Sequence, residues 1–296
     1  SLNSLSSIAS LLSAKSPLHH NVLTFWDRLE GETVLDIFYD YEFYDHPYDP
    51  IRRIVLGLTG RPKELDQMEE PFIWIERMME THAPYGKIRH GNTILRDLDV
   101  RQYIRFLKTG KLDPYREYLR GVLKLREHIL LHIRELEEMG LSERTLIVIC
   151  SDHGEILDPR TPEYHNTLPC RELVEVPIIF IPSQDDIPSI MTLVNVMPTA
   201  LDIMNIRWRA SLSMKGKKDM EKVVGVCVYG TLRSLWELRK DGQMRLLYVD
   251  DRKGFIRSYL ENILTRMFNI RALRPLASLS LELYSRFSSL LRPVSV

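Results

Sequence analysis

TLIVICSDHGE, residues Thr145 to Glu155, is the stretch of sequence that decides the fold class. Its first six residues are mostly apolar, and the run stops abruptly at a serine, an acid, an imidazole and a glycine. Such a run predicts a strand buried on both faces, and open α/β sheets bind ligands at the carboxyl ends of their strands. A carboxylate and a neutral imidazole are both good ligands for a divalent cation. Asp152 and His153 are therefore candidate metal ligands, although in isolation they also fit a helix cap and an ordinary loop histidine.

The segments around this stretch favour an α/β fold. Residues 115–139 repeat apolar side chains at three- and four-residue spacing and end at Gly140, which predicts a helix. Helix, short turn, buried strand and polar end make half of a βαβ unit. A further apolar strand is predicted from Val174 to Ile181, where Pro182 ends it, and a helix is predicted within Ile190 to Ile206.

A second apolar run also leads into polar residues. Pro71 to Ile75 predicts a buried strand, and the cluster that follows it contains Arg77 and His82. Pro84 favours an extended backbone at the residue before it, so His82 is expected on a stiff loop. Two strand ends thus offer histidines.

The amino-terminal residues form a different pattern. From Ser4 to Leu12, small hydroxyl residues alternate with apolar ones, and Pro17 follows. This pattern predicts a loop that enters a helix.

Composition limits the classes of partner. The chain has 296 residues with 40 basic and 40 acidic side chains, so its formal net charge is zero. This balance argues against a nucleic-acid surface or an anionic-membrane binder. No apolar run approaches the roughly 20 residues that span a bilayer. Three cysteines without zinc-knuckle spacing fit buried thiols in a reducing compartment, so the chain is expected to be soluble and cytoplasmic.

The carboxyl-terminal part has another pattern. Residues 223–229 and 245–249 predict paired strands around a turn at Asp241-Gly242, and residues 256–291 predict a helix. We therefore expect an α/β core over residues 1–210 and a strand-hairpin and helical subdomain over residues 211–296.

Several segments together resemble the sulfatase branch of the alkaline-phosphatase superfamily. TLIVICSDHGE is similar to that family's strand with two metal ligands, and PFIWIERMMETHAPY (residues 71–85) to its segment with His-x-Pro-Tyr. His165 followed by LVEVPIIFIP, and VNVMPTALDIMNI (residues 194–206), resemble the next histidine and the later helix. The opening SLSSIASLLSAKSPLHHNV (residues 4–22) is similar to the family's nucleophile segment. The resemblance implies a doubly wound, largely parallel central sheet flanked by helices.

The resemblance also implies roles for individual residues. Ser4 aligns with the nucleophile, and because the signature's proline and arginine are replaced by Ser6 and Ile8, a plain serine is expected. Asp152 and His153 would hold a divalent cation (Ca, Mg, Mn or Zn). Catalytic and substrate-binding roles are implied for four further residues. They are His82 and His165, as donors to the ester or its leaving group, and Lys87 and Arg77, as positive charges near the anion.

The implied reaction is hydrolysis of a sulfate or phosphate ester of a small molecule, glycan or lipid. Family members begin with a strand that ends in acidic metal ligands, and no such strand precedes Ser4. The core is therefore expected to be incomplete at its amino terminus. The alternative is a catalytically silent remnant or fragment that serves as a binding or scaffold module.

Overall fold

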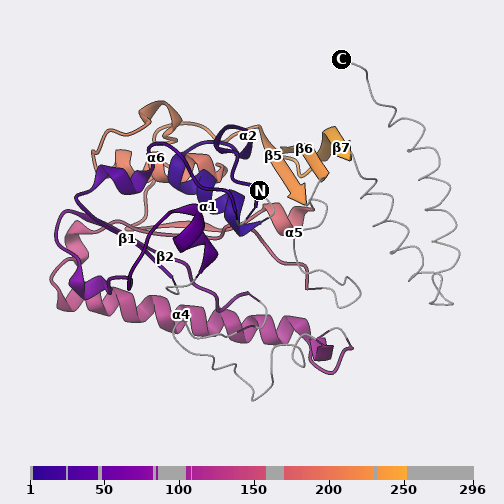
Figure 1. The fold of residues 1–296 in the computed structure, drawn as a ribbon. Helices are drawn as coiled ribbons and strands as arrows, with labels where there is room; N and C mark the ends of the chain where they lie inside the picture. Colours follow the sequence, from indigo (N-terminus) through magenta and orange to yellow (C-terminus); the bar gives the residue numbers. More distant parts are fainter. Residues whose placement is uncertain are drawn as a thin grey trace, which may run out of the picture.

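The computed structural model describes residues 3–24, 26–45, 49–82, 85, 105–107, 109–157, 170–229 and 232–251 (Figure 1). The helices are α1 (Ser4–Ser13), α2 (Pro17–His20), α4 (Pro114–Glu138), α5 (Arg171–Val174) and α6 (Leu193–Ile203). The strands are β1 (Asp40–Tyr44), β2 (Phe72–Glu76), β3 (Ile147–Cys150), β4 (Ile178–Ile181), β5 (Lys222–Tyr229), β6 (Leu232–Arg239) and β7 (Met244–Asp251). Short helical turns are η1 (Val34–Ile37), η2 (Ile51–Val55), η3 (Leu65–Gln67), η4 (Ser142–Arg144) and η5 (Ala210–Leu212).

Two strand pairs form the centre of the fold. β1 and β2 run parallel, with Asp40 opposite Phe72 and Tyr44 opposite Glu76. β3 and β4 run antiparallel. The predicted α/β class is confirmed, whereas the doubly wound, largely parallel order stays a prediction. An antiparallel neighbour needs no helical crossover, and the described part of the link from β3 to β4 contains only the single turn α5.

β1 and β2 lie between two helical layers, with α1 and α6 on one side and α4 on the other (Figure 1). Side chains alternate between the two faces of a strand, and β2 shows which face meets which helix. Ile73 and Ile75 pack against the main core, which includes α1 and α6. Phe72 and Trp74 pack in a second cluster with Leu136 of α4. Glu76 lies on the same face of β2 as Phe72 and Trp74, so its carboxylate points toward α4.

The predicted helix over residues 115–139 is confirmed as α4, and its ends have the expected signals. The carboxylate of Asp113 accepts hydrogen bonds from the backbone N–H groups of Tyr115 and Arg116, and Pro114 occupies the first turn. Beyond the helix, Gly140 has a φ of 69°. In the middle, a Cβ added to Gly121 would lie 2.3 Å from the carbonyl oxygen of Glu80. The backbone of α4 at Gly121 therefore lies directly against the backbone of the turn after β2.

α1 is a buried helix made largely of serine and leucine. The side chain of Asn3 caps it by accepting from the Ser6 N–H at 2.9 Å, so the predicted loop at Ser4 is the first helical turn instead. Its buried hydroxyls are bonded: Ser6 donates to the Val22 carbonyl and Ser13 to the Ala9 carbonyl. These bonds let a hydroxyl-rich helix pack against α6 in the core.

His20 is buried beside α1 as a neutral imidazole. Its Nδ1 accepts the Val22 N–H at 3.0 Å, so the ring hydrogen lies on Nε2, 3.0 Å from Ser10 Oγ. Burial lowers the pKa of His20 to about 4. In the unfolded chain this group titrates near 6.5.

The free energy of unfolding is therefore expected to fall as the pH drops from about 6.5 to about 4, because only the unfolded state takes up this proton there. The expected loss is about 2 to 3 kcal/mol. Urea unfolding at about pH 7 and about pH 4.5 would measure it. His20→Asn keeps an acceptor for the Val22 N–H without titrating. If the difference between wild type and His20→Asn does not change with pH, His20 is not the cause.

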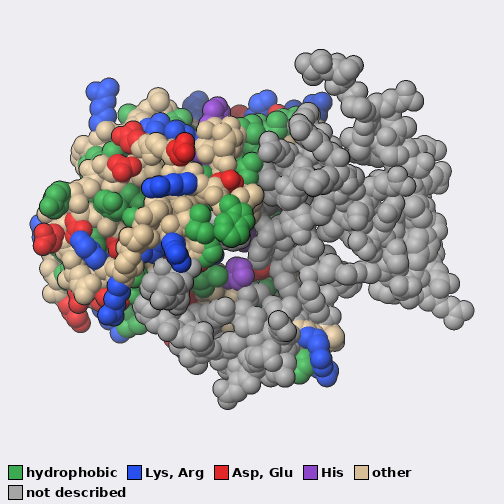
Figure 2. All heavy atoms as spheres, viewed as in Figure 1, with side chains coloured by type: hydrophobic (Ala, Val, Ile, Leu, Met, Phe, Trp, Pro, Cys, Tyr) green, Lys and Arg blue, Asp and Glu red, His purple; other side chains and the backbone are tan. Residues whose placement is uncertain are grey.

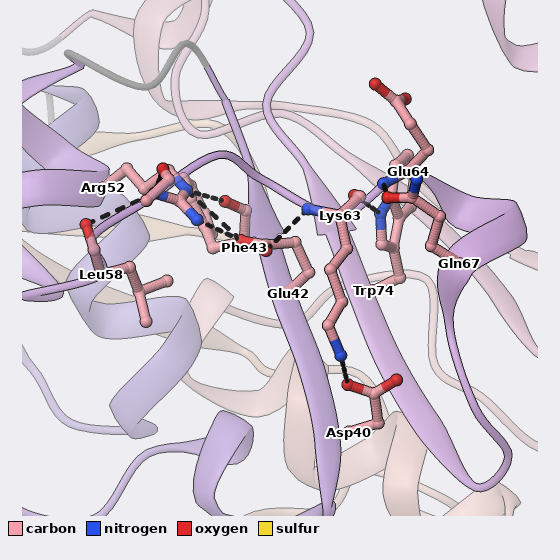
Figure 3. A network of polar contacts seen from close by, with 10 residues as sticks. Asp40, Glu42, Phe43, Arg52, Leu58, Lys63, Glu64, Gln67 and Trp74 are labelled. Carbon is pink, nitrogen blue, oxygen red and sulfur yellow. Dashed lines mark hydrogen bonds and ion pairs between the residues drawn. The ribbon is translucent and has the colours of Figure 1, made fainter.

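The polar face of β1 is covered by a buried ion network (Figure 3). Arg52 Nη2 lies 3.0 Å from Glu42 Oε1, and the two side chains are only 3% and 8% exposed. Arg52 also donates to the carbonyl oxygens of Phe43, Leu58 and Gly60 at 3.1, 3.4 and 3.1 Å. The network ties β1 to η2 and to the chain that follows it.

The carboxyl-terminal strands form an antiparallel sheet in the order β5-β6-β7. The turn at Asp241-Gly242 is confirmed, but it joins β6 to β7, and β5 pairs with β6. The predicted pairing of residues 223–229 with 245–249 is therefore wrong, because the intervening residues 232–239 form the central strand. The predicted helix over residues 256–291 lies outside the described residues, and the division at residue 210 stays a prediction.

The described surface mixes both signs of charge. Figure 2 shows basic and acidic side chains interspersed on the face that it presents. Among the described helices, none combines the length and the apolar composition needed to cross a membrane.

Candidate active site at the carboxyl end of β3

The loop after β3 is held in a fixed shape by its own hydrogen bonds. Ser151 Oγ donates to the carbonyl of His153 at 2.6 Å, and the His153 N–H donates to Asp152 Oδ1 at 3.0 Å. The Gly154 N–H donates to the Leu173 carbonyl at 2.9 Å. A Cβ on Gly154 would lie 1.9 Å from the Glu172 carbonyl oxygen, so only glycine permits this approach.

Ser4 meets this loop from α1. Its Oγ lies 3.2 Å from His153 Nε2, although 149 positions separate the two residues. The Nδ1 of His153 lies 2.8 Å from the Gly154 carbonyl oxygen, an acceptor, so Nδ1 carries the hydrogen. Nε2, the other ring nitrogen, faces the Ser4 hydroxyl.

Asp152 completes this cluster. Its Oδ2 lies 3.7 Å from His153 Nε2, and its side chain is 30% exposed. Burial alone would raise the pKa of Asp152, but His153, the Ser4 hydroxyl and Arg77 together lower it. The carboxylate is thus ionised at neutral pH and partly open to solvent.

Arg77 is positioned by two acids that the sequence analysis did not select. Its Nη1 lies 3.1 Å from Asp45 Oδ2 and 2.9 Å from Asp49 Oδ2. Burial opposes the effect, but these acids and Asp152 raise the pKa of Arg77. Its positive charge is therefore shared among three carboxylates, two of them in direct contact.

The remaining candidate residues are placed less fully. His82 lies half-buried in the turn after β2, where its N–H donates to the Met79 carbonyl at 3.1 Å. Lys87 and His165 lie outside the described residues. The structure thus brings Ser4, Asp152, His153 and Arg77 together, and the roles of His82, Lys87 and His165 stay predictions.

The donors at this loop fit part of the shell of a divalent cation. Ligand atoms around one tetrahedral zinc ion lie about 3.4 Å apart, as its bond lengths of about 2.0–2.2 Å require. The 3.7 Å between Asp152 Oδ2 and His153 Nε2 is close to this separation. The two side chains thus supply two ligands of suitable type.

A second group of possible ligands was missed from sequence. In the part of the chain that the structure describes, Glu76, His128 and His132 form a group of three with ligand atoms all within 4.8 Å. The signal for it was the four-residue spacing of the histidines on a helix.

Comparisons with known proteins show which family the chain resembles. A family model described as Sulfatase matches residues 7–206. The low-salt glycan biosynthesis sulfotransferase Agl7 of Haloferax volcanii is 32% identical over 216 residues, which cover 66% of this chain and 51% of that protein. The endo-4-O-sulfatase of Bacteroides thetaiotaomicron is 24% identical over 47% of this chain and 30% of that protein. The chain therefore spans about half the length, or less, of these curated relatives.

Two solved structures share the fold. BT4656 in complex with its substrate D-glucosamine-2-N,6-O-disulfate superposes with a TM-score of 0.53 at 12% identity, over 96% of this chain and 89% of that one. BT1596, a 2-O GAG sulfatase, gives a TM-score of 0.50 at 16% identity, over 88% of this chain and 81% of that one. Because the family model matches well over half of the sequence, this chain belongs to the sulfatase family.

Proposed function

We propose that the chain cleaves or transfers a sulfate ester, with Ser4 as the nucleophile. The observation that carries the proposal is the 3.2 Å contact between Ser4 Oγ and His153 Nε2 at the end of β3. A serine is a weak nucleophile unless a neighbouring group activates it. Here the hydroxyl oxygen lies beside His153 Nε2, and the hydroxyl donates its hydrogen to the Asp152 carboxylate.

The position of Ser4 also suits an anionic substrate. Ser4 opens α1, a ten-residue helix, and the free N–H groups and dipole at a helix amino terminus favour anions. A sulfate group bound at this end of the helix would lie beside Ser4. Arg77 adds positive charge from the end of β2.

In the proposed reaction, Ser4 Oγ forms a bond to sulfur while the bond from sulfur to the ester oxygen breaks. The Ser4 proton passes to the Asp152 carboxylate, which already accepts a hydrogen bond from the hydroxyl, and His82 or His165 protonates the leaving alkoxide. Water or an acceptor hydroxyl then attacks the sulfur and releases Ser4. When held by Asp152 and His153, a divalent cation would lower the pKa of the hydroxyl and offset the charge on the sulfate oxygens.

We further propose a sulfated sugar as the substrate. This choice rests on the names of the relatives, one a glycan-biosynthesis sulfotransferase and one an endo-sulfatase, and on the disulfated glucosamine bound by the first structural neighbour. Sulfate release to water would identify a hydrolase, and sulfate on an added sugar would identify a transferase.

Asp152→Asn tests the role of the cation. Asn keeps the acceptor for the His153 N–H but removes the charge, so we expect kcat/KM to fall at least about 100-fold. Unfolding stability should change by no more than about 1 kcal/mol. Aryl sulfate and aryl phosphate turnover, with and without a chelator, provides the measurement. Turnover that survives both the variant and the chelator would remove the metal-dependent mechanism, and no turnover by wild type would favour the silent module.

A further inference from the structure

Glu76, His128 and His132 form a compact group on the α4 side of β2. Glu76 Oε2 lies 2.8 Å from His132 Nε2, and Glu76 Oε1 lies 3.5 Å from His128 Nε2. The two histidines are four residues apart, so they lie on one face of α4, and their ring centroids are 4.9 Å apart. Both imidazoles therefore direct Nε2 to the same carboxylate.

The other nitrogen of each ring is held by a further carboxylate. His128 Nδ1 lies 2.7 Å from Glu80 Oε1, and His132 Nδ1 lies 2.6 Å from Glu135 Oε2. A carboxylate accepts a hydrogen bond from Nδ1–H, so Nε2, which faces Glu76, is the nitrogen of each ring that would bind a metal. Metal-bound histidines commonly have this outer carboxylate, which orients the ring and makes it a stronger ligand.

Burial also favours a cation in this group. The side chains of Glu76 and Glu80 are 2% and 3% exposed, and those of both histidines are 16% exposed. Two carboxylates so far from water are costly unless positive charge accompanies them. A divalent cation would supply that charge at the point where the three ligand atoms converge.

We infer that Glu76, His128 and His132 bind a divalent transition metal of the zinc class, at a site separate from Asp152 and His153. One carboxylate oxygen and two imidazole nitrogens suit zinc, with water in the fourth position. The metal joins the end of β2 to the middle of α4. Arg77 directly follows Glu76. A metal bound to Glu76 would therefore also restrict the movement of Arg77 at the end of β2.

Zinc titration of the metal-stripped full chain tests this inference. In an Asp152→Asn background, which weakens the other site, we expect one zinc ion per chain and a melting temperature that rises with zinc. His128→Gln/His132→Gln should abolish both effects. Glu80→Gln, which keeps the shape of the outer partner but not its charge, should weaken zinc binding about 10- to 100-fold. His19→Gln, at an exposed histidine of α2, is the matched control and should leave zinc binding unchanged.

Two results would overturn the inference. One is a zinc stoichiometry and affinity that are the same in His128→Gln/His132→Gln and in wild type. The other is a folded Asp152→Asn protein that binds no zinc, which would make the group a buried network of ion pairs. If the double variant does not fold, histidine ring NMR of the Asp152→Asn protein decides, because one equivalent of zinc should shift two of the nine histidines. Neither result bears on Ser4-dependent turnover, so the proposed function is tested independently.

Discussion

Replacing Glu42 with leucine is expected to lower the free energy of unfolding by about 3 to 5 kcal/mol, because it leaves the buried Arg52 guanidinium without its carboxylate. Arg52 is only 3% exposed, and its remaining partners would be the neutral carbonyl groups of Phe43, Leu58 and Gly60 (Figure 3). A lone cation in that position cannot recover its hydration. Urea unfolding at neutral pH would measure the loss.

The double variant Glu42→Leu/Arg52→Met separates charge burial from packing. It removes both charges, so it should be more stable than the sum of the two single changes predicts, by at least about 1 kcal/mol. Glu70 and Arg144 form a matched surface pair at 2.9 Å, with side chains 45% and 63% exposed. Arg144→Met should therefore cost no more than about 1 kcal/mol. A Glu42→Leu protein as stable as Arg144→Met would contradict this account of the network.

The elements with strong local signals were predictable from the sequence. α4 has a capped start, a long apolar period and a glycine end, and β3 is an apolar run with a polar end. These signals depend on near neighbours, so they need no knowledge of the fold. The order of the segments resembles that of the sulfatase family, and this resemblance selected Ser4 together with Asp152 and His153. The structure places Ser4 Oγ 3.2 Å from His153 Nε2.

The features that could not be predicted from the sequence depend on contacts between residues far apart in the chain. β1 was not predicted, because Asp40, Glu42 and Tyr44 face a polar network and the strand lacks an apolar pattern. Nothing local to Arg77 shows that it pairs with Asp45, which is 32 positions away. Likewise, the four-residue spacing of His128 and His132 indicates a ligand group only when Glu76 is known to lie on the face of β2 that meets α4.

Under the proposed mechanism, Ser4, which contacts His153 in the loop after β3, is the most sensitive position for activity. Ser4→Ala is expected to lower kcat/KM for an aryl or sugar sulfate at least about 1,000-fold, because no hydroxyl remains to attack sulfur. Stability should change by no more than about 1 kcal/mol, since Asn3, not Ser4, supplies the helix cap. Mass spectrometry of the peptide with Ser4, after a rapid acid quench, should find a sulfate adduct in wild type and none in Ser4→Ala.

Ser13→Ala is the matched control within the same helix. Its hydroxyl donates to the Ala9 carbonyl at 2.6 Å at the far end of α1, so the change should cost about 1 kcal/mol of stability and leave turnover unaltered. Ser4→Thr keeps a hydroxyl and should recover part of the activity that Ser4→Ala loses. Full turnover by Ser4→Ala would place the nucleophile elsewhere, and the contact between Ser4 and His153 would then serve only to fasten α1 to the loop after β3.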